Sequence, residues 1–105
     1  MPEVNVALLA FVERYAGTPI KWDIVALFAE NPGLRDDAAH IAARLGRAAA
    51  PVARELDDLT LLGLLDVTRP AARSVYYLAA DGELRARLAE FAAQGWRAAV
   101  GRVGD

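Results

Sequence analysis

Arginine side chains are the groups in this sequence whose spacing is best suited to a chemical role. Five of them lie in the middle of the 105-residue chain, whereas lysine occurs once in the whole sequence. Exposed guanidinium groups can hold phosphate oxygens or enter the minor groove of a duplex. The five are Arg44, Arg47, Arg54, Arg69 and Arg73. The same stretch holds four carboxylates, so its local charge is close to neutral: Glu55, Asp57, Asp58 and Asp66.

Other reactive side chains are scarce. The chain has no cysteine, which removes disulfides, thiolate metal ligands and thiol nucleophiles. The single histidine, His40, has no second metal ligand beside it in the sequence, so we expect its side chain to be solvated. The pair Asp57 and Asp58 has no glycine-rich phosphate loop beside it, and a solvated helix face is expected there. The sequence therefore predicts no metal, no cofactor and no enzyme activity.

Length and composition predict a single domain. The chain is 55% hydrophobic and 25% charged, which is typical of a globular protein with one core. A net charge of −2 offers no general attraction for nucleic acid. The N-terminus lacks a basic region followed by an apolar run, and no stretch is apolar enough to span a membrane. We therefore expect a cytoplasmic protein with no membrane contact.

Four helices are expected in the first 62 residues, because apolar residues recur there at three and four positions. The first helix covers Glu3–Tyr15 and is ended by the glycine and proline that follow it. The second helix runs from about Lys21 to Glu30. Asp36 or Asp37 caps a short third helix, which Gly46 closes. The fourth runs from about Ala49 to Leu62.

The chain then changes to a two-residue period, which indicates a β-hairpin. Apolar and polar residues alternate over residues 65–69 and 74–78, with Pro70 to Ala72 at the hairpin tip. Asp81 caps a last helix. The expected fold is α+β and mainly helical: a winged helix-turn-helix with N- and C-terminal flanking helices. One domain covers residues 1–105, with the helix-turn-helix at about 37–62, the wing at about 64–78 and the C-terminal helix at about 82–100.

The stretch from Asp37 to Leu78 resembles the winged helix-turn-helix domains of bacterial transcription regulators. Such domains place small and apolar residues where this chain has Ala38, Ile41, Ala42 and Leu45, followed by a turn glycine, here Gly46. The second helix is then anchored at Val52, Leu56 and Leu59, and a Gly-Leu pair, Gly63-Leu64, starts the wing. The returning strand Arg73-Ser74-Val75-Tyr76-Tyr77-Leu78 is most similar to the wing of the ArsR family.

This resemblance implies a transcriptional regulator that binds duplex DNA as a homodimer. DNA contacts would come from the first reading helix, the early part of the second and the wing: Arg44, Arg47, Ala49, Ala50, Ala53, Arg54, Arg69 and Arg73. The terminal helices would form the dimer interface, through Leu8, Phe11, Val12, Leu84, Leu88, Phe91 and Trp96. Metal sensing is not implied, because the cysteine pairs and the terminal-helix histidine that metal-sensing members use are missing.

The reading helix itself is rich in alanine, and this leaves two functions open. Alanine cannot form the bidentate hydrogen bonds that distinguish bases, and offers only methyl contact to thymine. DNA affinity is therefore expected to be modest and to fall steeply with salt. The alternative is a winged-helix interaction module that has lost DNA binding and uses its alanine-rich helix against a protein partner.

Overall fold

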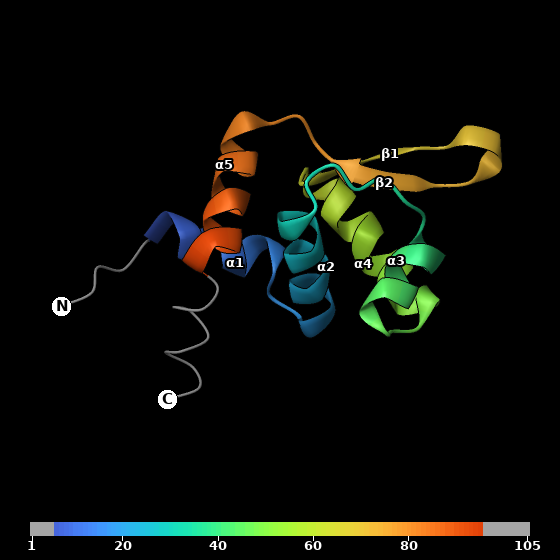
Figure 1. Ribbon diagram of the computed structural model, residues 1–105, viewed down its shortest axis with the longest axis horizontal. Helices are drawn as coiled ribbons and strands as arrows, with labels where there is room; N and C mark the ends of the chain where they lie inside the picture. The colour runs from blue at the N-terminus through green and yellow to red at the C-terminus, as the bar shows by residue number, and fades with distance from the viewer. Residues whose placement is uncertain (1–5, 96–105) are drawn as a thin grey trace.

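The computed structural model describes residues 6–95 of the chain. The elements follow one another as four helices, a hairpin and a fifth helix, which is the predicted order (Figure 1). The hairpin strands pair antiparallel. The elements are α1 Val6–Tyr15, α2 Pro19–Glu30, α3 Ala38–Leu45, α4 Ala49–Leu61, β1 Leu65–Thr68, β2 Val75–Leu78 and α5 Gly82–Glu90, with short turns η1 Pro70–Ala72 and η2 Phe91–Gly95.

Helix α2 begins two residues earlier than predicted. Thr18 caps it by accepting a hydrogen bond from the Lys21 backbone N–H at 3.2 Å, and Pro19 takes the first helical position. Proline is tolerated there because the first-turn N–H groups have no partner within a helix. Pro19 therefore starts the second helix rather than only ending the first.

Helix α3 begins and ends at the predicted residues. The Asp37 side chain accepts a hydrogen bond from the His40 backbone N–H at 2.9 Å and so caps the helix. Gly46 adopts the left-handed conformation at its end, with φ of 66°. Helix α4 has no side-chain cap at Ala48.

The core lies between α4 and the helices around it. The inner face of α4 is fully buried at Val52, Leu56 and Leu59, and α2 contributes the equally buried Ile24 and Phe28. This packing fixes α4 against α2 and α3 through one face and leaves the opposite face outward. The order, the α3–α4 pair and the hairpin together form a winged helix-turn-helix.

The wing is held to the body of the protein by a third, short backbone pairing. Tyr76 in β2 exchanges two backbone hydrogen bonds with Asp36, at 2.8 and 3.2 Å. At the tip, Ala71 and Ala72 both have positive φ, of 52° and 65°. These are left-handed conformations that L-residues other than glycine rarely adopt, so the tip is locally strained.

The C-terminal helix begins at the predicted residue and changes from regular α-helix to a wider turn after Glu90. Asp81 caps it as expected, and the wider turn covers Phe91 to Gly95. In this turn the Phe91 ring packs edge-on against Trp22, 5.2 Å between centroids. The predicted continuation to about residue 100 lies outside the described residues. Within residues 6–95, no helix has the length and apolarity that crossing a membrane requires.

Candidate nucleic-acid interface

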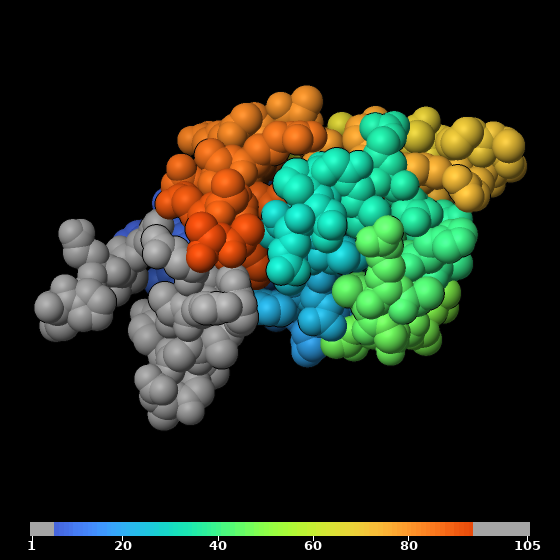
Figure 2. Space-filling view, in the orientation of Figure 1, coloured from blue at the N-terminus to red at the C-terminus, as the bar shows by residue number. Residues whose placement is uncertain are grey.

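The outward face of α4 is a stripe of exposed residues opposite the buried one. Ala50, Arg54, Asp57 and Leu61 are spaced by three or four positions and are all exposed. Ala49 is also exposed, and Ala53 is half-buried beside the stripe. Figure 1 shows the wing extending past α3 and α4 at one end of the molecule, with α1 and α5 at the other. The space-filling view shows the wing projecting from that end (Figure 2).

Of the five arginines predicted to contact DNA, three are exposed and have no ion-pair or hydrogen-bond partner within residues 6–95. Arg54 lies on the outward face of α4, Arg69 at the end of β1 before the wing tip, and Arg44 in the last turn of α3. Within residues 6–95, no carboxylate lies within ion-pair distance of any of these three arginines. Their guanidinium groups are therefore available for an external anion.

The other two arginines are held by the protein. The Arg47 Nε lies 2.7 Å from Asp23 Oδ2 on α2, and the side chain is only one-third exposed. Arg73, after the wing tip, donates to Asp37 Oδ2 at 3.2 Å. Arg47 therefore joins the α3–α4 turn to α2, and Arg73 joins the wing to the start of α3.

Asp57 and Asp58 lie at the solvated surface of α4, as expected, and each also has a partner in the protein. The Tyr76 hydroxyl donates to Asp57 at 2.5 Å. Burial of this hydroxyl, followed by its hydrogen bond to Asp57, raises the pKa of Tyr76 to about 12. Asp58 and Glu55 both contact Lys21, at 2.6 and 3.0 Å, and these bonds raise the pKa of that lysine.

Lys21 changes the charge balance of the reading surface. It comes from α2, distant in sequence, and so was not counted with the arginine-rich stretch. Since it neutralises part of the charge of Glu55 and Asp58, the exposed arginines face less opposing charge than the sequence suggested. Asp57 remains on the outward face, and Asp66 remains exposed on β1.

His40 has partners that sequence reasoning missed. Its Nδ1 lies 2.8 Å from Asp37 Oδ1 and 3.4 Å from Asp36 Oδ1, although the side chain is 66% exposed. Hydrogen bonds from the backbone and ring of His40 lower the pKa of Asp37. The three side chains lie close enough to share a metal ion, but both Asp37 oxygens already accept hydrogen bonds. We assign no ligand to this cluster.

One more cation lies beside the wing. The Arg35 guanidinium stacks over the Tyr77 ring, 4.0 Å from its centroid. Tyr76 is buried and Tyr77 half-buried, so one tyrosine faces the core and the other covers the sheet. The local sequence around Arg35 carries no sign of this contact, because its partner lies 42 residues later.

The residues predicted for a dimer interface divide into two groups. Leu8, Phe11, Leu88 and Phe91 are buried within a single chain, at 1–6% exposure, and so belong to its core. Val12 and Leu84 are half-buried at the surface of α1 and α5. Trp96 lies outside the described residues. Dimerisation through these helices stays a prediction that rests on their outer faces.

Comparisons with known proteins match the fold. No protein-family model matches the sequence, and no curated protein does. HlyU from Vibrio cholerae N16961 superposes with a TM-score of 0.62 at 17% identity, covering 83% of this chain and 90% of that one. The reduced form of HlyU superposes with a TM-score of 0.63 at 16% identity, covering 83% of this chain and 87% of that one. A structure described as a predicted DNA-binding transcriptional regulator from E. coli superposes with a TM-score of 0.64 at 21% identity, covering 81% of this chain and 85% of that one. At these identities the likeness shows a shared winged-helix fold.

Proposed function

We propose that this protein is a dimeric, cytoplasmic transcriptional regulator that binds duplex DNA through α4 and the wing. The observation that carries the proposal is the set of exposed, unpaired guanidinium groups on these elements. Arg54 on α4 and Arg69 at the wing would bind phosphates on either side of a groove, because arginine is well suited to phosphate oxygens. One of the structural neighbours reported above is described as a predicted DNA-binding transcriptional regulator, which supports the same function.

The α4 surface favours binding by shape over strong base recognition. Ala49 and Ala50 are exposed in its first turn, and their methyl groups can contact only apolar parts of the major groove. Arg47 is paired with Asp23, so we propose that it positions the helix and adds little direct contact. Modest affinity with strong salt dependence follows from this arrangement.

Dimerisation would bring two reading helices to one duplex. The outer faces of α1 and α5 would form the contact, with half-buried Val12 and Leu84 and the 73% exposed Val6. A symmetric dimer uses the same patch twice, so a small apolar face contributes double its area. Light scattering coupled to gel filtration measures the mass and would refute this step if it gave a monomer at the concentrations used for DNA binding.

The test of DNA binding is fluorescence anisotropy with mixed-sequence duplex at about 50 mM and about 200 mM salt. We expect the affinity to fall at least about tenfold between these salt concentrations, since each phosphate contact releases counterions. The double variant Arg69→Glu, Arg73→Glu should lose binding while its circular dichroism spectrum stays that of the folded protein.

A matched control keeps the same change in net charge away from the proposed interface. Arg14→Glu with Arg85→Glu places the reversals on α1 and α5, at the other end of the molecule. Because α1 and α5 are also the proposed dimer contact, light scattering must first show that the control keeps the mass of the parent protein. A control of unchanged mass should retain most of the affinity. Equal loss in both double variants would show that only net charge matters, and normal binding by the wing variant would refute the role of the wing.

A second function is favoured by one observation. Leu61, at the end of the outward face of α4, is 86% exposed and offers an apolar surface that a protein could cover. If no DNA binding is found at low salt, this surface becomes the leading candidate for protein docking. Leu61→Asp should then abolish capture of a partner while leaving the fold intact.

A further inference from the structure

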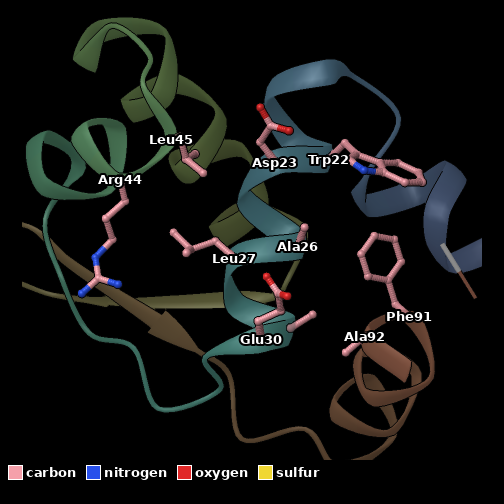
Figure 3. A pocket seen from close by; sticks show the side chains of 10 residues that line it. Trp22, Asp23, Ala26, Leu27, Glu30, Arg44, Leu45, Phe91 and Ala92 are labelled. Atoms are coloured by element: carbon pink, nitrogen blue, oxygen red, sulfur yellow. The ribbon is translucent and has the colours of Figure 1, made fainter. Parts of the chain in front are cut away.

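A groove runs over the exposed side of α2, away from the proposed DNA interface at α4 and the wing. Its volume is about 540 Å³, within the usual range for small-molecule sites. Figure 3 shows α2 along its floor, between Arg44 and Leu45 on one side and Phe91 and Ala92 on the other. The groove therefore touches both the helix-turn-helix and the turn that follows α5.

The walls of the groove are mainly apolar. Leu27 lies on the side of α2 toward Arg44, whereas Trp22 lies on the side toward Phe91, with the small Ala26 between them (Figure 3). The Trp22 and Phe91 rings contact each other edge to face, which fixes the aromatic wall. An occupant with an aromatic or branched apolar body would gain most of its binding energy here.

Two opposite charges at the groove are exposed and have no partner within residues 6–95. Arg44 and Glu30 both line it, yet within residues 6–95 neither makes an ion pair or a side-chain hydrogen bond, with each other or with another residue. The third charged group, Asp23, is already paired with Arg47. A purely anionic ligand would meet the Glu30 carboxylate, and a purely cationic one would meet the Arg44 guanidinium.

We infer that the groove binds a small zwitterion with a bulky apolar side chain, that is, a hydrophobic α-amino acid. Its carboxylate would pair with Arg44, its ammonium with Glu30, and its side chain would lie against the apolar walls. Charge complementarity favours this class, because it carries both charges and an apolar body in one small molecule. The site does not depend on DNA binding, and its test uses no DNA.

The test is a titration of the full-length protein, followed by amide shifts in two-dimensional nitrogen–proton spectra. Four probes separate the parts of the proposed ligand: L-phenylalanine, phenethylamine without the carboxylate, 3-phenylpropionate without the ammonium, and glycine without the apolar body. We expect saturable shifts in α2 and at the end of α3 with L-phenylalanine, at a Kd of about 1 mM. Each singly charged analogue should bind at least about tenfold more weakly, and glycine should cause no saturable shift.

Variants of groove residues give the matched controls. Ala26→Leu fills the floor and should abolish binding, whereas Ala39→Leu makes the same change on an exposed part of α3 outside the groove and should not. Arg44→Gln should lower affinity for L-phenylalanine to that for phenethylamine, which keeps the test decisive if Ala26→Leu fails to fold. No saturable shift at about 20 mM L-phenylalanine, or equal binding of 3-phenylpropionate, would overturn the inference.

Discussion

The two faces of α4 have opposite surroundings within a single helix. On the inner face, Val52, Leu56 and Leu59 are completely buried and pack against α2 and α3. On the outer face, Ala50, Arg54 and Leu61 are exposed and pack against nothing in the described chain. Folding therefore depends on the inner face of the helix, and the proposed recognition depends on the outer face. Substitutions on the two faces should change different measured quantities.

The largest expected effect comes from the inner face. Leu56→Ala should lower the free energy of unfolding by about 3 kcal/mol, because a completely buried leucine leaves a cavity that its neighbours cannot close. Leu61→Ala deletes the same atoms at an 86% exposed position, and should change stability by less than about 0.5 kcal/mol. Urea unfolding of both variants measures the contrast. Similar losses would mean that the two faces are not distinct.

An intermediate effect is expected at Tyr76 of β2. This residue is buried in the core, and its hydroxyl bonds to Asp57 on the outer face of α4. Tyr76→Phe removes the hydrogen bond to Asp57 and should lower the free energy of unfolding by about 1.5 kcal/mol near neutral pH. The raised pKa of Tyr76 gives this contribution a pH dependence. Because its pKa is about 12 when folded and 10 ordinarily, the stabilisation is complete below pH 10.

As the pH rises from 10 to about 12, the folded protein loses this stabilisation. The difference in stability between the wild type and Tyr76→Phe should therefore shrink across that range. Unfolding of both proteins at a series of alkaline pH values measures it. A difference that stayed constant to pH 12 would contradict the raised pKa of Tyr76.

The smallest effect is expected at the wing, where Arg69 is free and Arg73 is held by Asp37. Asp37→Asn should keep the helix cap, since asparagine caps as well as aspartate, but should release Arg73 for DNA. We expect DNA affinity to rise about threefold at low salt, the size expected for an exposed ion pair. Asp66→Asn removes the same charge from β1 and should raise affinity less. Equal gains would mean that Arg73 was never restrained.

Local signals in the sequence were sufficient to predict most of the fold. The cap at Asp37, the glycine at Gly46 and the change to a two-residue period after Gly63 each depend on neighbouring residues, and each was predicted correctly. The wider turn at Phe91 was not predicted, because apolar spacing does not distinguish it from regular α-helix.

Much of the candidate site depends on contacts that local patterns cannot show. Sequence reasoning identified all five arginines, but which of them are free is decided by distant carboxylates. Arg47 is paired with a residue 24 positions earlier, and Arg73 with one 36 positions earlier. Lys21 contacts α4 from another helix for the same reason. Tertiary packing alone creates the groove on α2.

The backbone pairing of Asp36 with Tyr76 also bears on aggregation. A hairpin normally has two open edges, and unpaired N–H and C=O groups on an edge can recruit a strand from another molecule. Asp36 occupies the outer edge of β2 at Tyr76, so a new strand could not add there without displacing it. The remaining open edge, β1, is only four residues long and carries the charged Asp66. The wing can therefore project into solvent with little tendency to polymerise.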